Sequence, residues 1–174
     1  ADGSYVGIAP TSPPTITIDT DYSVMYIQPH NISSYLFYIQ ANTYQLRQLV
    51  FDFVINKQKS EDMTLLADHI LRDGNGAFTM ERQQSPCDRI WVTRNDGQLA
   101  ILTRNVEQQI DAWMRFISGT SSGGPGLFKG ISVISVDGGD DQVWVSVQRI
   151  INGSTVQFIE LFSNELFQNY WEPK

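Results

Sequence analysis

The fold of this chain is decided by residues 89–104, which read RIWVTRNDGQLAILTR. β-Branched, aliphatic and aromatic residues fill both halves of this stretch, and such residues favour strands. Asn95-Asp96-Gly97 separates the two halves, and tight hairpin turns prefer these residue types because they tolerate a positive φ. The stretch therefore predicts an antiparallel β-hairpin.

Two further stretches have the same organisation. Residues 35–52 and 142–162 each contain an aromatic residue in their first strand-like run, then a polar turn and a second run. From one hairpin to the next, the aromatic residues Phe37, Trp91 and Trp144 are separated by 54 and 53 positions. Because they and one further tryptophan lie inside strand-like runs, we expect them to face a core. The predicted structural core residues are Phe37, Trp91, Trp113 and Trp144.

More strand-like runs complete the pattern. The predicted strands are residues 23–28, 35–40, 45–54, 77–84, 89–94, 98–104, 110–117, 130–136, 142–148 and 155–162. A period of about 40 to 50 residues built from four short strands is typical of a β-propeller blade. We therefore expect an all-β, antiparallel fold of about three four-stranded, blade-like units. Since a propeller normally needs at least four blades to close, the chain is either an excerpt of a larger ring or a β-sandwich.

The predicted domain organisation has three parts. Residues 1–14, rich in Gly, Ser, Thr and Pro, form an extended connector, residues 15–165 the β-rich domain, and residues 166–174 a C-terminal tail. We expect one short helix that begins near Ser60 and ends at residues 73–76, since Asp-Gly-Asn-Gly stops a helix. Its apolar face would contain Met63, Leu66, Ala67, Ile70 and Leu71.

Composition narrows the class of protein. The 174 residues are 41% hydrophobic and 18% charged, which favours a packed chain over a disordered one. The net charge of −7 disfavours direct wrapping of DNA, although an acidic channel lining that repels DNA stays compatible with it. No apolar run has the length of a membrane span, and Cys87 is the single cysteine, so an internal disulfide is excluded.

Candidate chemistry is sparse. Asp62 and Asp68, with Glu61 nearby, suggest paired carboxylates for glycoside hydrolysis, but nothing in the sequence places a second acid opposite this helix. Favourable electrostatics at the helix N-terminus explains Asp62 and Glu61 better. His30 and His69 lie far apart in the sequence, without a nucleophile elbow. Residues 137–141 (DGGDD) suggest calcium, yet lack the spacing of a hand-type loop. Residues 119–126 lack the ending of a phosphate-binding loop and predict a flexible loop. We expect no catalytic, cofactor-binding or metal residues.

Arginine residues flank the aromatic strands of the middle unit. Arg94, Arg104 and Arg115 are candidate interface residues, because Arg and aromatic side chains are enriched where subunits meet. The polar faces of alternating strands would explain the same residues.

Several short segments, taken in order, point to a family. They are LRQL (46–49), DMTLLADHIL (62–71), QQSP (83–86), IWVTRNDGQL (90–99), LT (102–103), EQ (107–108), AWMR (112–115), RIING (149–153) and VQFIE (156–160). This order, which covers roughly residues 20–162, resembles the tail nozzle, or packaged-DNA stabilisation, proteins of short-tailed (podovirus-type) bacteriophages. The chain departs from the family pattern at Thr93, where a Cys is usual, and at Met114, where an aromatic or His residue is usual.

The resemblance implies a structural protein without enzymatic activity, located in the virion tail. Family members form a ring below the portal, so the implied partners are other copies of the chain, adaptor or other tail proteins, and DNA as passing cargo. They are longer than this chain, which the resemblance makes a partial-length relative. A β-rich module of a phage tail that binds carbohydrate or a receptor is the alternative, and exposed Trp or Tyr on loops would favour it.

Overall fold

The computed structural model describes residues 20–54, 56–121 and 124–163, and its regular secondary structure is almost entirely antiparallel strand. Sheet 1 contains β1 (His30–Ile32), β2 (Tyr35–Ile39), β3 (Leu46–Asp52) and β4 (Lys57–Asp62). Sheet 2 contains β5 (Ala77–Gln83), β6 (Arg89–Arg94), β7 (Leu99–Asn105) and β8 (Ile110–Phe116). Sheet 3 contains β11 (Leu127–Ile134), β12 (Gln142–Ile151) and β13 (Ser154–Phe162). The short pair β9 (Thr120–Ser121) and β10 (Gly124–Pro125) connects sheets 2 and 3, and α1 spans Asp68–Arg72.

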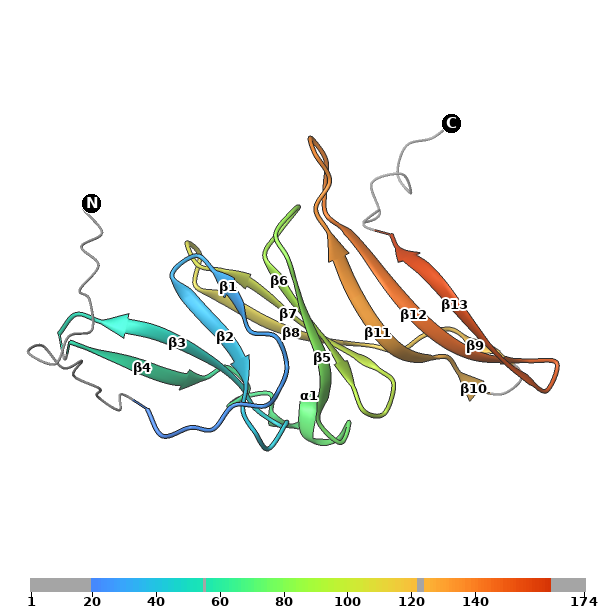
Figure 1. Ribbon diagram of the computed structural model, residues 1–174, viewed down its shortest axis with the longest axis horizontal. Helices are drawn as coiled ribbons and strands as arrows, with labels where there is room; N and C mark the ends of the chain where they lie inside the picture. Colours follow the sequence, from blue (N-terminus) through green and yellow to red (C-terminus); the bar gives the residue numbers. More distant parts are fainter. Residues whose placement is uncertain (1–19, 55, 122–123, 164–174) are drawn as a thin grey trace, which may run out of the picture.

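Each sheet is an antiparallel meander of consecutive strands, so spatial order follows chain order in all three. The sheets succeed one another along the long axis of the molecule, from blue-cyan through green and olive to orange-red (Figure 1). Their first strands lie close together, because β5 contacts both β1 and β11. The expected all-β fold of about three blade-like units is confirmed. The third unit has three strands instead of four, and the described sheets do not close into a barrel or ring.

Two hydrophobic clusters hold the sheets together, one on each face of sheet 2. Ile90 and Val92 of β6 point into the first cluster, with residues of sheet 1 and α1, whereas Trp91 points into the second, with residues of sheet 3. Alternate residues of a strand face opposite sides, so a strand covered on both faces reads as a continuous apolar run. This is why residues 89–104 dominate the sequence pattern.

The predicted helix is the main correction at the level of elements. Residues Ser60 to Asp62 are not a helix start but the end of β4, where they pair with β3 from Arg47 to Leu49. Ladder pairing with a neighbouring strand supersedes the local helix signal, and only Asp68–Arg72 is helical, with Ile70 and Leu71 buried. Residues 23–28 form a single bridge, Val24 to Gln40, instead of a strand.

Some expectations lie outside the described residues. These are the connector at residues 1–14, the first residues of the predicted β-rich domain, 15–19, and the tail at residues 166–174. Among the helices of the described part, none is long and apolar enough to cross a membrane.

Candidate functional site

Three of the four aromatic residues predicted to form the core lie in or against a hydrophobic cluster. Phe37 is fully buried in the first cluster, and Trp113 is half-buried against it, donating a hydrogen bond from Nε1 to the carbonyl of Met63 at 2.9 Å. Trp91 is 1% exposed in the second cluster, where Nε1 donates to Gln83 Oε1 at 3.0 Å. Buried indoles normally find such an acceptor.

Trp144 differs from the expectation. Val143, Val145 and Val147 of β12 point into the second cluster, so Trp144 lies on the opposite face of sheet 3, half-buried and outside both clusters. Its Nε1 donates to Gln142 Oε1 on the same strand at 3.2 Å. Periodicity placed the residue in the correct strand, but no described element covers the face on which it lies.

The position of Trp144 within its sheet repeats that of the buried aromatics. Phe37, Trp91 and Trp144 are each the third residue of the second strand of their sheet. Phe37 points from sheet 1 toward sheet 2, and Trp91 points from sheet 2 toward sheet 3. Trp144 points in the same sense along the stack, away from sheet 2. We call this surface the outer face of sheet 3, and it is the candidate functional site.

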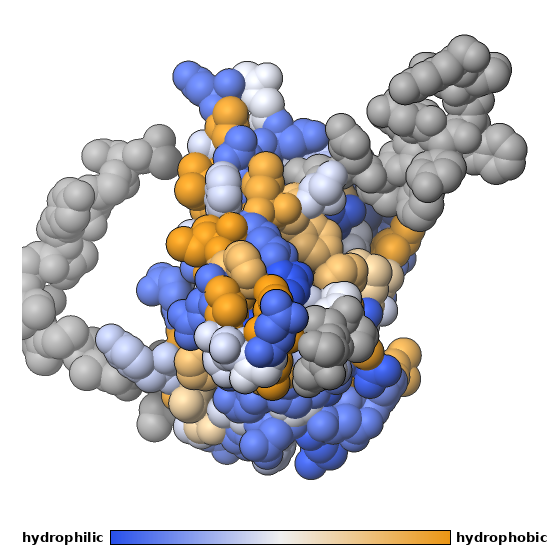
Figure 2. All heavy atoms as spheres, turned by 90° about the vertical axis from the view of Figure 1, so that its right-hand side faces the viewer, coloured by the Kyte–Doolittle hydropathy of each residue, from blue (hydrophilic) through white to orange (hydrophobic). Residues whose placement is uncertain are grey.

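Aliphatic side chains surround Trp144 on the outer face of sheet 3. Leu161 pairs with Trp144 across β12 and β13, Ile159 pairs with Ser146, and Ile134 pairs with Gln142. Ile134 is 52%, Ile159 78% and Leu161 50% exposed. Figure 2 views the molecule from the sheet 3 side, where apolar side chains gather over the middle and polar ones dominate the base. Contiguous exposed apolar side chains mark interaction surfaces.

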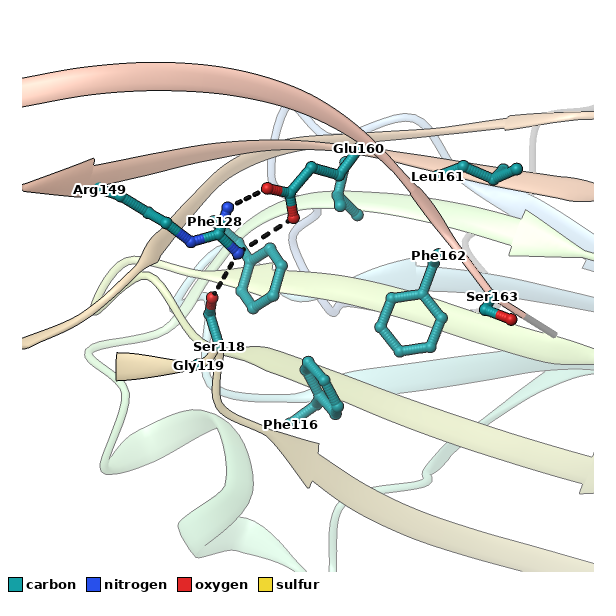
Figure 3. Close-up of a pocket in the computed structure, with 10 residues that line it drawn as sticks. Phe116, Ser118, Gly119, Phe128, Arg149, Glu160, Leu161, Phe162 and Ser163 are labelled. Atoms are coloured by element: carbon teal, nitrogen blue, oxygen red, sulfur yellow. Dashed lines mark hydrogen bonds and ion pairs between the residues drawn. The ribbon is translucent and has the colours of Figure 1, made fainter. Parts of the chain in front are cut away.

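A cavity of about 380 Å³ lies between sheets 2 and 3 at one end of the second cluster. Aromatic rings form much of its wall: Phe116 lies 5.0 Å from Phe162 and 5.9 Å from Phe128, between ring centroids (Figure 3). Arg149, on β12, closes one side by a bidentate pairing with Glu160 and donates to Ser118 Oγ at 3.1 Å.

Arg149 and Glu160, the two charged residues in the lining of this cavity, form an ion pair with each other. The Glu160 carboxylate, through hydrogen bonding and charge, raises the pKa of Arg149 further above its usual range. Glu160 is the one carboxylate in the lining, and it is held by Arg149, so the lining offers no pair of free acids for acid–base chemistry.

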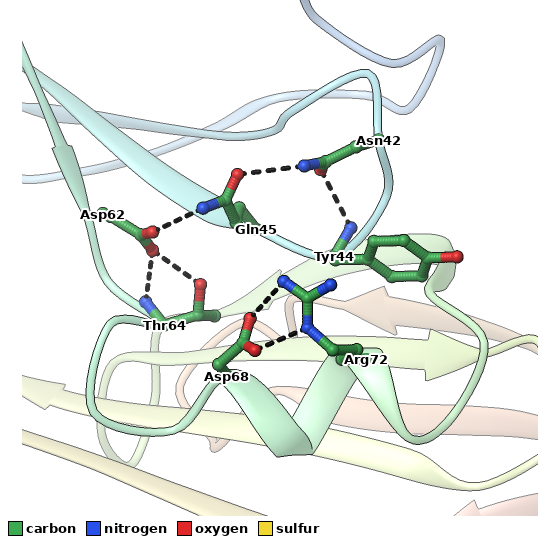
Figure 4. A network of polar contacts seen from close by, with 7 residues as sticks. All are labelled: Asn42, Tyr44, Gln45, Asp62, Thr64, Asp68 and Arg72. Atoms are coloured by element: carbon green, nitrogen blue, oxygen red, sulfur yellow. Dashed lines mark hydrogen bonds and ion pairs between the residues drawn. The ribbon is translucent and has the colours of Figure 1, made fainter.

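The two acids considered for glycoside hydrolysis are bonded within a local polar network (Figure 4). Asp62 accepts hydrogen bonds from Gln45 Nε2 at 2.9 Å and from the backbone N–H and hydroxyl of Thr64. Asp68 pairs with Arg72 one helical turn on, at 2.5 Å, and this hydrogen bond lowers the pKa of Asp68 below its usual range. An acid held ionised in this way is unsuited to donate a proton.

The loop considered for calcium joins sheet 3 to sheet 2 instead. Asp141 Oδ2 accepts the backbone N–H groups of Gln84 and Ser85 at 2.6 and 3.0 Å, and Asp140 accepts the Ser85 hydroxyl at 2.8 Å. Burial by itself would raise the pKa of Asp141, but the hydrogen bonds to its carboxylate outweigh burial, and the pKa lies below its usual range. We call this contact the Asp141 clamp.

The other candidate groups are dispersed. His30 lies on β1, where its Nε2 contacts the Met80 carbonyl at 3.1 Å, whereas His69 lies in α1. Cys87 is a free, half-buried thiol in the β5–β6 loop. Within the described ranges, no group of three or more His, Cys, Asp or Glu residues is placed to hold a metal ion.

Two of the three predicted interface arginines are internal. Arg94 is buried, pairs with Asp96 through two hydrogen bonds, and packs so tightly on Gly74 that a β-carbon there would overlap its guanidinium. Arg104 is buried between sheets 1 and 2, with its guanidinium 4.5 Å from the Tyr35 ring. Both serve contacts inside the chain. Arg115, on edge strand β8, is exposed and stays available as an interface residue.

Comparison with models of known protein families and with curated proteins finds no match to this chain.

Sequence reasoning missed the outer face of sheet 3 and the aromatic cavity. The alternation of Ile159 and Leu161 along β13 was the available signal for the face, since both residues share a side with Trp144. No local signal brings Phe116, Phe128 and Phe162 together, because they come from three strands in two sheets.

Proposed function

We propose that the chain is a non-enzymatic structural subunit of a bacteriophage tail, part of a nozzle- or tube-like ring below the portal that helps to retain and pass the genome. The observation that carries the structural role is the position of Trp144. Two equivalent aromatics are covered by the next sheet of the stack, and the third lies uncovered among exposed aliphatic side chains. A stack that ends in this way is suited to continue into a further sheet. The phage setting rests on the resemblance of the sequence.

The chemistry of the described residues supports a mechanical role. Asp62, Asp68, Asp141 and Glu160 each accept hydrogen bonds from neighbouring groups that hold the fold together. The net charge of −7 suits a surface past which DNA slides better than one that grips it, because like charges repel the phosphate backbone.

Electron microscopy of purified virions with a gold-labelled antibody to the chain tests this proposal. We expect label at the tail, below the portal, and loss of label when the antibody is first absorbed with the purified chain. Virions without label, from infected cells that contain the chain as free protein, would contradict the proposal.

A carbohydrate-binding module of a phage tail is a second candidate, and Trp144 is again the observation that favours it. A half-buried indole on a sheet face, beside Gln142 and Ser132 and with Gln148 further along β12, offers an apolar surface for stacking and amide groups for hydroxyls. Titration with glycans of the host surface, followed by tryptophan fluorescence, tests it. Saturable binding that is lost in Trp144→Ala would favour this function over the first.

A further inference from the structure

We infer that the outer face of sheet 3 binds the outer face of sheet 1 of a second copy of the chain, head to tail. This inference rests on the proposed structural role and names the partner of the same surface. The contact joins two different faces, each of which is present on every copy of the chain.

The interfaces inside the chain follow one rule. We call the face of a sheet that is directed from sheet 1 toward sheet 3 along the stack its forward face, and the opposite face its backward face. The forward face of sheet 1, with Phe37, packs on the backward face of sheet 2, and the forward face of sheet 2, with Trp91, packs on the backward face of sheet 3. The outer face of sheet 3 is a forward face, and the outer face of sheet 1 is a backward face. A single chain therefore supplies both halves of one more interface of the same kind.

The outer face of sheet 1 is apolar enough to serve as the partner surface. Leu36 and Leu49 are cross-strand neighbours on it and are half-buried. Beyond them, the rings of Phe51 and Phe53 meet edge to face at 4.9 Å between centroids, and Phe53 is 86% exposed at the end of β3. Arg47 on the same face lies beneath the Tyr22 ring, 3.4 Å from its centroid, and its cross-strand neighbour on that face is Asp62, which has the opposite charge. Aromatic side chains are enriched at the centres of interfaces, which are more apolar than the rest of the protein surface.

Charge favours a second copy over repulsion between copies. The strand register places these side chains on the outer face of sheet 3: Ser132, Ile134, Gln142, Trp144, Ser146, Gln148, Gln157, Ile159 and Leu161. None of these nine side chains is ionisable, although the chain as a whole carries a net charge of −7. The exposed Lys129 lies at the bulge of β11, where the register with β12 shifts. A neutral face is the part of an acidic molecule that a second acidic molecule can approach without burying like charges.

Two matched variants test the contact by analytical ultracentrifugation. Ile159→Glu places a charge on the outer face of sheet 3, and Phe53→Glu does so beside the outer face of sheet 1. Leu66→Glu, at a residue 97% exposed in the loop before α1, is the control. We expect the wild type and the control to self-associate, and each of the two variants to associate at least about tenfold more weakly, because an unpaired charge is costly to bury. Circular dichroism confirms that each variant keeps its strands.

Mixing the two variants distinguishes a head-to-tail contact from other arrangements. Ile159→Glu keeps an intact sheet 1 face and Phe53→Glu keeps an intact sheet 3 face, so the mixture should form a 1:1 complex that neither variant forms alone. If Phe53→Glu still self-associates while Ile159→Glu does not, sheet 3 faces pair with each other and the inference is wrong. A wild-type chain that stays monomeric at ~100 μM also overturns it. Neither result affects the virion experiment, which detects where the chain is located and not how copies contact each other.

Discussion

Trp91 and Trp144 are the same residue type at the same position of their strands, in surroundings that differ. Trp91 lies between two sheets, its ring 4.9 Å from that of Phe162, whereas Trp144 lies on a sheet face that no described element covers. A comparison of the two residues therefore shows how much of the contribution of such a tryptophan to the free energy of unfolding comes from packing against a further sheet.

Trp91→Ala should lower the free energy of unfolding by about 3–5 kcal/mol, as truncation of a large core side chain does. Trp144→Ala should lower it by about 1 kcal/mol or less in the monomer, because the side chain is partly solvated already. Urea unfolding followed by circular dichroism, at a concentration where the chain is monomeric, measures both values. A loss below about 1 kcal/mol for Trp91→Ala would show that the repeat places this residue wrongly.

Residue patterns predicted the strand in which an aromatic residue lies better than they predicted whether another sheet packs on that residue. Phe37 and Trp91 were identifiable as core residues because each lies in a run of apolar residues, which is typical of a strand buried on both faces. Trp144 lies in a similar run, yet whether a further sheet covers it depends on where the stack stops. Arg94 and Arg104 were misassigned for a related reason, because Asp96, Gly74 and the ring of Tyr35 make a buried arginine acceptable.

Among the elements, the Asp141 clamp connects the loop before β12 to the loop after β5. Asp141→Asn should lower the free energy of unfolding by about 1–3 kcal/mol at neutral pH, since the two backbone N–H groups lose a charged acceptor. Asp137→Asn, at an exposed position of the same loop, is the matched control and should change it little.

Acid should remove the contribution of the clamp. The pKa of Asp141 is lower in the folded chain than its ordinary value of 3.8, so the folded state favours the ionised form. Its contribution to stability is fully present above the unfolded pKa and is lost as pH falls through the folded pKa. Unfolding free energies measured from pH 6 downward should converge for wild type and Asp141→Asn at the acid end. Parallel curves for the two proteins would contradict the assigned role.

Strand assignment from sequence succeeded where the strand carries its own apolar alternation and failed where it does not. Nine of the ten predicted strands correspond to strands of the structure, from β2 to β13. β4 reads KQKSED and has no apolar residue, so only its pairing with β3 makes it a strand. The brief β1 is missed because three residues give too short a pattern.

Across the whole molecule, sheet 2 is the only described sheet with a hydrophobic cluster on each face. Exposing its inner strands to solvent requires separation from both neighbours, whereas sheets 1 and 3 need to separate from one. We expect native-state hydrogen exchange to be slowest for the amides of β6 and β7. Slower exchange in β12 than in β6, measured on the monomer, would contradict this order of stability.

The sequential layout of the sheets also has a consequence for synthesis. Every sheet is complete within one continuous segment of chain, from residue 30 to 62, 77 to 116 and 127 to 162. Ribosomes add about 5 to 20 residues per second, and domains tend to fold from the N-terminus as they emerge. Sheet 1 can thus form while sheet 2 is still being translated. Its apolar face is then exposed to solvent for only seconds before sheet 2 packs on it. The growing chain repeats this cycle once for each sheet, so every nascent sheet is the surface on which the following one folds.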